Sequence, residues 1–286
     1  MQFYQRYYTM QQLFEAGVHY GHRKDLWNPQ MEKYVYGIQN GVHIIDLQQT
    51  VIALEKALNA LRAVASQNGR ILFVCTKKHV RDVVAESAQR CGQYYTNYRW
   101  LGGTLTNWVT ISASLKKLKE YKAVLNDEKN PLIKKERLFL KRKCDKLENV
   151  LGGIYNMGGV PDMVFVIGTN ASSTAVEEAR KLGISVCAIV DTNCDPTKGI
   201  DYVIPGNDDA RRSIELYCKL AADAVLVGIQ ESLQHSGVDM GAVQELHKTG
   251  FIPRRAKGKM HNMHSTRVAE CAIQSEEEKD EGSPRE

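Results

Sequence analysis

Residues 70–75 have the sequence RILFVC and residues 163–167 the sequence MVFVI, and both runs are apolar at every position after the first arginine. A strand that is apolar on both faces is typical of a parallel sheet covered by helices on each side. Three further β-branched runs lie at Val42–Leu47, Val186–Val190 and Tyr202–Ile204. The sequence therefore predicts a parallel sheet built from such short strands.

Helical patterns of apolar residues separate these runs. They lie at Gln49–Gln67, His79–Arg90, Ser172–Leu182 and Asp208–Leu233. Alternating strands and helices are typical of an α/β domain, in which right-handed crossovers place helices over the sheet. We therefore predict a Rossmann-like or flavodoxin-like parallel sheet formed by residues 1–105 and 155–235.

One insertion interrupts the alternation between strands and helices. Residues 106–154 contain no β-rich run, and their apolar residues recur at heptad spacing. These residues are Trp108, Ile111, Leu115, Leu118 and Leu125, then Leu140, Cys144, Leu147, Leu151 and Ile154. Narrow apolar stripes and charged outer faces predict an antiparallel coiled-coil hairpin that turns at Asn126–Pro131. The alternative, two helices lying flat on the sheet, requires wider apolar faces and fewer lysines.

The net charge of the 286 residues is +5, and it is unevenly distributed. Residues 115–149 carry +6, residues 246–269 carry another +6, and residues 275–286 carry −4. Basic segments attached to a near-neutral body favour a polyanionic partner, although such charge runs are also common on solvated faces. The extension 236–286 has few apolar residues, so we expect it to be largely disordered.

Cysteine content and hydropathy indicate a reducing compartment without a membrane partner. The seven cysteines are an odd number and include no CxxC pair. No run approaches the roughly 18 apolar residues that a spanning helix needs. The first residues, MQFYQRYYTM, lack an apolar core and hold a single arginine, so we expect neither a signal peptide nor a transit peptide.

The loops that follow the predicted strands carry no catalytic motif. Thr76-Lys77-Lys78 lacks the glycines of a dinucleotide loop, and no G-x-S-x-G elbow occurs. The segment Gly153–Gly159 has G-x-x-x-x-G spacing, but it precedes a strand and lacks the phosphate-binding lysine. We interpret it as a flexible joint at the end of the hairpin. The missing glycine loop and nucleophile therefore argue against enzymatic activity, and we expect no cofactor.

Carboxylates at the same sheet edge raise a separate hypothesis. Asp191 follows one predicted strand, and Asn207-Asp208-Asp209 opens the last long helix. Together with His19 and His22, the three aspartates form a speculative metal site. The alternative is structural, because Asn207 is a good N-cap and acidic side chains favour the first turn of a helix.

Two segments combine basic and aromatic residues, which supply phosphate contacts and stacking planes for unpaired bases. They are GVHYGHRKDLWNP at 17–29 and YRWLGG at 98–103. The candidate RNA-binding residues are His19, His22, Arg23, Lys24, Trp27, Lys77, Lys78, Arg99 and Trp100, with Lys116, Lys117, Arg142 and Lys143 in the hairpin. The indoles of Trp27 and Trp100 are equally compatible with packing in the core.

Five strings occur in a fixed order between residues 8 and 233. They are GVHYGHRKDLWNP, YRWLGGTLTNW, GGVPDMVFVI, AIVDTNCDP and VIPGNDDA. The sequence resembles the small-subunit ribosomal protein 2 family of bacterial and organellar type. This resemblance implies a Rossmann-like domain with a coiled-coil hairpin, and a structural constituent of the small ribosomal subunit. It further implies contacts with small-subunit rRNA, with other small-subunit ribosomal proteins and, in many bacteria, with the large mRNA-binding first protein of that subunit.

The expected location is the ribosome in the cytoplasm of a bacterium, with an organellar matrix or stroma as the alternative. Two other function classes stay open from the residues alone. An α/β enzyme that uses Asp191 and Asp208 predicts a small-molecule ligand at the sheet edge. A coiled-coil adaptor that binds only proteins predicts no salt-sensitive association with RNA.

Overall fold

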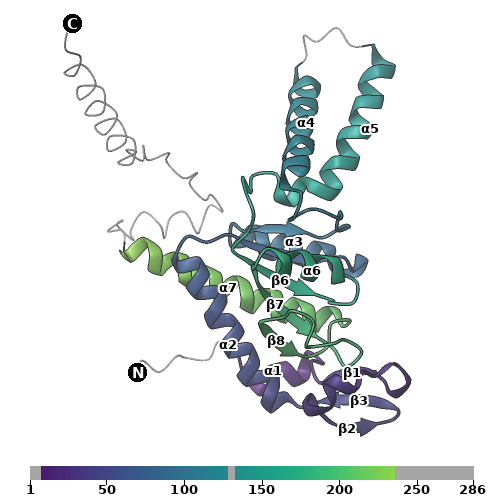
Figure 1. Cartoon of the computed structure of the whole chain (residues 1–286), viewed down its shortest axis with the longest axis vertical. Helices are drawn as coiled ribbons and strands as arrows, with labels where there is room; N and C mark the ends of the chain where they lie inside the picture. The colour runs from purple at the N-terminus through teal and green to yellow at the C-terminus, as the bar shows by residue number, and fades with distance from the viewer. Residues whose placement is uncertain (1–7, 128–132, 236–286) are drawn as a thin grey trace, which may run out of the picture. The chain divides into compact units, whose positions relative to one another are not determined.

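The computed structural model describes residues 8–127 and 133–235 and has a five-stranded parallel sheet at its centre (Figure 1). The strands are β4 (Ile71–Cys75), β5 (Tyr94–Thr96), β6 (Met163–Ile167), β7 (Ser185–Val190) and β8 (Tyr202–Pro205). Their order is β5-β4-β6-β7-β8, and every neighbouring pair is parallel. Numbered along the chain this is the order 2-1-3-4-5 of flavodoxin-like folds, so the predicted fold class is confirmed.

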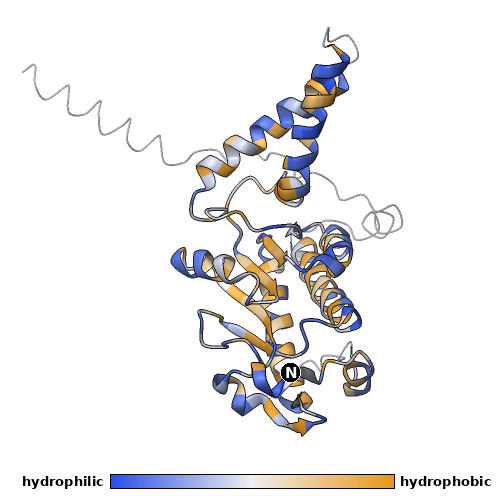
Figure 2. Cartoon of the chain, turned by 90° about the vertical axis from the view of Figure 1, so that its right-hand side faces the viewer, coloured by the Kyte–Doolittle hydropathy of each residue, from blue (hydrophilic) through white to orange (hydrophobic). Residues whose placement is uncertain are grey.

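Helices cover both faces of this sheet. Outside the hairpin they are α1 (Met10–Glu15), α2 (Leu47–Ser66), α3 (Arg81–Arg90), α6 (Ser173–Lys181) and α7 (Arg211–His235). Helices α1, α2, α3 and α7 pack on one face of the sheet, and α6 packs on the other face. The central strands of the parallel sheet are orange in Figure 2, whereas blue and orange stretches alternate along the helices, as burial of one helix face requires.

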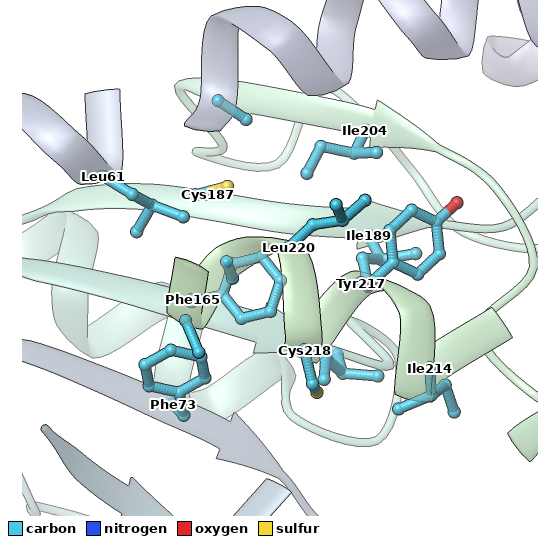
Figure 3. Packing of buried hydrophobic residues seen from close by; sticks show 14 of the residues in the cluster. Leu61, Phe73, Phe165, Cys187, Ile189, Ile204, Ile214, Tyr217, Cys218 and Leu220 are labelled. Atoms are coloured by element: carbon cyan, nitrogen blue, oxygen red, sulfur yellow. The ribbon is translucent and has the colours of Figure 1, made fainter. Parts of the chain in front are cut away.

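The alternation of side chains along each strand supplies two apolar layers. Phe73 and Phe165 meet edge to face on the layer under α2 and α7, with ring centroids 5.4 Å apart (Figure 3). The neighbouring positions Leu72 and Val74 point to the other layer and pack with α6. Among the described helices, none combines the length and the hydrophobicity that crossing a bilayer requires.

One predicted strand does not belong to the parallel sheet. The run at 42–47 forms β3 (Val42–Ile45), the central strand of a separate antiparallel sheet with β1 (Tyr20–Arg23) and β2 (Val35–Gln39). The turn between β2 and β3 is Asn40-Gly41, and both residues have positive φ. Asn-Gly is a strong signal for a two-residue β-hairpin, so the sequence contained the information that this strand pairs locally.

The insertion forms two helices, α4 (Trp108–Asn126) and α5 (Lys134–Leu151), which lie side by side (Figure 1). The predicted stripe is largely their buried face. Its fully buried members are Ile111, Leu115, Leu118, Cys144, Leu151 and Ile154. Lys122, the polar member of the stripe, places its Nζ 2.6 Å from Oε1 of Glu148 on the other helix. A helical pair is thus present, and its supercoiling remains a prediction.

The start of α4 and the end of α5 pack against the sheet. Ile111, Leu115 and Leu151 belong to the apolar layer that includes Leu72 and Val74. Leu118 and Cys144 are buried outside that layer. The predicted extension 236–286 and most of the predicted turn of the hairpin lie outside the described residues.

Gly153 is a point of close contact rather than a joint. A Cβ atom added at this position would overlap the carbonyl oxygen of Tyr95 on the edge strand β5. The backbone between α5 and β6 therefore approaches the sheet more closely than any side chain allows, which anchors the returning arm of the hairpin.

Replacing Gly153 with alanine tests this close approach. We expect Gly153→Ala to lower the free energy of unfolding by about 1–3 kcal/mol, because the backbone must move away from Tyr95. Urea denaturation followed by circular dichroism measures the change. Gly37→Ala is the control, since a Cβ there meets nothing within 4 Å. Equal stability of the two variants would contradict the role assigned to Gly153.

Candidate functional site

Residues 17–28 are hydrogen-bonded to the loops that follow β7 and β8. The amide of Asn207 donates to the carbonyl of Val18 at 3.0 Å, and the amide of His22 donates to Oγ1 of Thr192 at 2.8 Å. A Cβ at Gly21 would lie 2.6 Å from the Thr192 side chain. This glycine is therefore required by packing against Thr192, and that packing holds His22 at the carboxyl edge of the sheet.

We use the name carboxyl-edge cluster for His22, Lys77, Asp191, Asp208 and Asp209. The imidazole of His22 lies between two carboxylates, with Nδ1 3.1 Å from Asp191 and Nε2 3.1 Å from Asp209. Lys77 Nζ lies 2.7 Å from Oδ1 of Asp208 and 2.7 Å from Oδ1 of Asp209. Three loops of the parallel sheet and strand β1 of the small sheet thus bring a lysine, a histidine and three carboxylates together.

Burial and ion pairing compete in the electrostatics of this cluster. Asp191 is 1% exposed and Asp208 2% exposed. Burial raises the pKa of Asp208 to about 6; the charge of Asp191 acts in the same direction, and Lys77 opposes it. Burial lowers the pKa of Lys77, but its ion pairs with Asp208 and Asp209 outweigh that effect, so the pKa is raised overall.

The surroundings of His22 favour the protonated form of its imidazole. Its hydrogen bond with Asp191 raises the pKa of the imidazole, burial opposes this shift, and the charges of all three aspartates reinforce it. A cationic group is therefore stabilised where the three carboxylates converge.

The same carboxylates and His22 have the geometry of metal ligands. One ligand atom from each of His22, Asp191, Asp208 and Asp209 lies within 4.8 Å of the others. Nitrogen and carboxylate oxygen are donors that zinc accepts. His19, the fifth hypothesised ligand, is not part of this group, because its buried ring stacks on Phe14 with centroids 4.4 Å apart.

The structural alternative for Asn207 is also present. Its Oδ1 accepts hydrogen bonds from the amides of Asp209 and Ala210, at 2.8 and 3.0 Å, just before α7 begins. Asn207 therefore orders the turn that presents Asp208 and Asp209. The same turn therefore caps α7 and positions the carboxylates of Asp208 and Asp209.

Lys77 also lies at the crevice where the strand order reverses between β4 and β6. Ligands of open α/β sheets bind at that crevice. A Cβ at Gly168, after β6, would lie 2.9 Å from Cε of Lys77. The Lys77 side chain and its ion pairs with Asp208 and Asp209 therefore lie at this crevice.

A single carboxylate organises the second basic and aromatic segment. Glu178 on α6 is buried and accepts hydrogen bonds from Trp100 Nε1 at 3.0 Å and from the amides of Gly103 and Leu105 at 2.7 and 2.9 Å. The amide and hydroxyl of Thr106 also donate to it, each at 3.2 Å. Burial raises the pKa of Glu178, but the hydrogen bonds lower it by a larger amount. The pKa of Glu178 is therefore below its usual value.

The candidate aromatic residues are largely enclosed by protein. Trp100 is 8% exposed and belongs to the apolar layer under α6. Trp27 is half-buried and stacks on His43, with ring centroids 5.3 Å apart. The alternative of buried packing therefore describes Trp100 in this structure and much of Trp27.

The remaining basic candidates are on the surface. They are Arg23, Lys24, Lys78, Arg99, Lys116, Lys117, Arg142 and Lys143, all of which are exposed. Arg23 forms an ion pair with Asp25 at 3.1 Å, and the ammonium of Lys143 lies 4.4 Å from the ring centre of Phe139. These side chains are accessible to a polyanion, whereas Lys77 is already paired with carboxylates.

Glu178→Gln is expected to destabilise the protein by about 1–3 kcal/mol at pH 7, because the amide presents a donor to backbone donors. The lowered pKa means that Glu178 contributes fully above the unfolded-state value of about 4.3, and loses that contribution as the pH falls below it. The difference between wild type and variant in urea denaturation should therefore narrow at pH 3.5. Glu177→Gln, at an exposed neighbouring position, is the control, and an equal effect of both changes would contradict this assignment.

Comparisons with known proteins agree with the geometry. Residues 13–228 match the family model described as ribosomal protein S2. The chain is 56% identical over 236 residues to the small ribosomal subunit protein uS2 of a Bradyrhizobium species, covering 82% of this chain and 71% of the relative. It is 56% identical over 239 residues to that of Paramagnetospirillum magneticum, covering 83% and 90%, and 54% identical over 239 residues to that of Granulibacter bethesdensis, covering 84% and 92%. The family match spans both the sheet and the inserted helices, so the chain belongs to the ribosomal protein S2 family.

Proposed function

We propose that the chain is a structural, non-catalytic constituent of the small ribosomal subunit. Its membership of the ribosomal protein S2 family carries this proposal, and the relatives described above are small ribosomal subunit proteins of bacteria. The bacterial relatives favour a cytoplasmic ribosome over an organellar one. The proposed partners are small-subunit rRNA, other small-subunit proteins and the large mRNA-binding first protein of the subunit.

The exposed basic residues are the proposed phosphate contacts of the body. Arg23 and Lys24 extend from β1, Lys78 follows β4, and Arg99 lies in the loop that Glu178 organises. Phosphate contacts position a protein on RNA without reading its sequence. The buried candidates His19 and Trp100 support this surface from beneath by fixing the segments that carry the cations.

The hairpin is a second proposed RNA contact. Lys116 and Lys117 on α4, and Arg142 and Lys143 on α5, are exposed on helices whose apolar residues face inward. The hairpin then adds phosphate attraction to a body that is near neutral.

We propose the division of the chain into an α/β domain (1–105 and 155–235), the hairpin (106–154) and an extension (236–286).

Charge reversal of the hairpin tests this assignment. A variant with glutamate at positions 116, 117, 142 and 143 is expected to dissociate from small subunits at lower salt in sucrose gradients. Each lost phosphate contact reduces the slope of log affinity against log salt concentration by about 0.9 on a duplex and about 0.7 on a single strand. Wild type should co-sediment with small subunits through moderate salt.

A control of equal charge change carries glutamate at exposed lysines of the body. These are Lys33, Lys56, Lys181 and Lys198. A slope equal to that of the hairpin variant would contradict a specific role of the hairpin. A free-protein peak alone for the wild type would exclude the ribosomal assignment, and the adaptor alternative predicts association without any salt-sensitive contribution from RNA.

We also propose that His22, Asp191, Asp208 and Asp209 bind a divalent cation such as zinc. The convergence of their ligand atoms within 4.8 Å supports this role. A cation at this position takes over the neutralisation that the protonated imidazole of His22 supplies to the carboxylates. The proposed role is structural, since the cation links the β1 segment to the loops after β7 and β8.

Metal analysis tests the cation site. Protein dialysed against zinc and then freed of excess metal should retain about one zinc per chain by mass spectrometry of the digested sample. Asp191→Ala should reduce this amount severalfold, because it removes a buried ligand. Asp25→Ala removes an exposed carboxylate outside the cluster and serves as the control. Equal metal content in all three proteins would end the hypothesis.

A further inference from the structure

A cavity of about 580 Å³ lies where the end of β5 meets the end of α5. We call it the Tyr98 pocket and define it by Arg81, Tyr95, Asn97, Tyr98, Asn149 and Gly153, which line it together with neighbouring residues. Its volume is within the range of sites for small organic ligands. It is separate from the carboxyl-edge cluster, with which it shares no residue.

One wall of the Tyr98 pocket is a flat, fixed surface. The guanidinium of Arg81 lies 3.9 Å from the centre of the Tyr98 ring, and its Nη2 donates to the carbonyl of Tyr98 at 3.2 Å. Nδ2 of Asn97 donates to the carbonyl of Arg81 at 2.7 Å. Tyr98 is 43% exposed despite these contacts. Two planar groups are thus held in one orientation at an accessible surface, as stacking with a base requires.

The other walls carry polar groups suited to the edge of a base. Asn149 has an exposed amide, and Asn97 retains the carbonyl oxygen of its side chain as an acceptor. Glu148 also lines the cavity, and its carboxylate pairs with Lys122. A carboxylate accepts hydrogen bonds from an exocyclic amino group but repels a phosphate. The polar groups therefore favour a nucleobase inside the cavity, and they disfavour a phosphorylated peptide.

Cations nearby are suited to the backbone of the same strand. Lys119 and Lys122 both lie over the ring of Tyr155, at 5.1 and 5.0 Å from its centre. Arg99, next to Tyr98 in the chain, is exposed. The cations of Lys119, Lys122 and Arg99 thus add to that of Arg81, which is stacked on Tyr98 within the lining. This distribution matches a single strand whose base enters the cavity and whose phosphates stay outside.

We propose that the Tyr98 pocket binds one unpaired nucleobase of single-stranded RNA, stacked against the Arg81–Tyr98 pair. The proposal rests on the ribosomal function proposed above and adds a specific mode of RNA contact to it. The amides of Asn97 and Asn149 pair with the edge of the base. Lys119 and Arg99 contact the flanking phosphates.

The test uses the full chain and a hexauridine strand in which the third base is 2-aminopurine. The fluorescence of 2-aminopurine should change when the wild-type protein binds, because the base leaves the stack of the strand and enters the pocket. Tyr98→Ala should weaken binding about tenfold and abolish this change, which is within the range for loss of one stacked base. Arg81→Lys keeps the charge but loses the planar group, so it should weaken binding without altering the salt slope.

Matched controls separate the pocket from general RNA attraction. Tyr36→Ala removes an exposed tyrosine from β2 and should bind as the wild type does. Asn149→Ala changes an exposed position and should weaken binding even if Tyr98→Ala fails to fold. An abasic site in place of 2-aminopurine should weaken binding of the wild type by about the same factor as Tyr98→Ala.

The pocket proposal would be overturned if the Tyr98, Arg81 and Asn149 variants bound RNA as tightly as the wild type does. It would also be overturned if the wild type bound the abasic strand as tightly as the intact strand. Failure of the wild type to bind the strand, with co-sedimentation of the protein and small subunits intact, would overturn the pocket proposal alone. Absence of that co-sedimentation would overturn the ribosomal function itself.

Discussion

The burial of Asp191 and Asp208 is the constraint around which the carboxyl edge of the sheet is arranged. An ionised carboxylate removed from water loses several kcal/mol of hydration unless opposite charge and hydrogen bonds replace it. Lys77 supplies that charge from the loop after β4, and the imidazole of His22 in β1 lies 3.1 Å from Asp191. The compensation requires segments from both ends of the described chain, so the edge is held closed by electrostatics as well as by apolar packing.

The sheet could be predicted because its signal is local. Five successive apolar residues in β4 and in β6 are compatible with few environments other than a covered parallel strand. β5 gives no such signal, since Tyr94–Thr96 is short and its residues are only partly apolar. The pairing of β3 outside the main sheet was missed for another reason: strand propensity alone does not specify the partner, and here the Asn40-Gly41 turn specifies it.

The residue types of the candidate site could be predicted from the sequence, but the role of each residue could not. Asp191 follows β7, and Asp208 and Asp209 follow β8, so the topology of the parallel sheet brings the three aspartates to one edge. His22 lies in β1 of the small sheet and joins them there. Sequence reasoning placed Trp100 at a possible RNA contact, but it could not find Glu178, which enters the loop from a helix 78 residues away. A glutamate within a helical pattern carries no local signal of burial. Whether an aromatic residue beside basic residues packs in the core or is exposed for contact with RNA is therefore known only once the fold is known.

The hydrogen bonds of Asn28, His22 and Gly17 with the loops after β7 and β8 span from 164 (Asn28 to Thr192) to 190 positions of the chain. Synthesis proceeds from the N-terminus, so this segment leaves the ribosome long before its partners have been made. Contacts of such long range form late, after the loop-closure entropy has been offset by the rest of the sheet. The surface around His22 therefore arises only on chains whose last strand is in place, and its presence distinguishes a completed molecule from a nascent fragment.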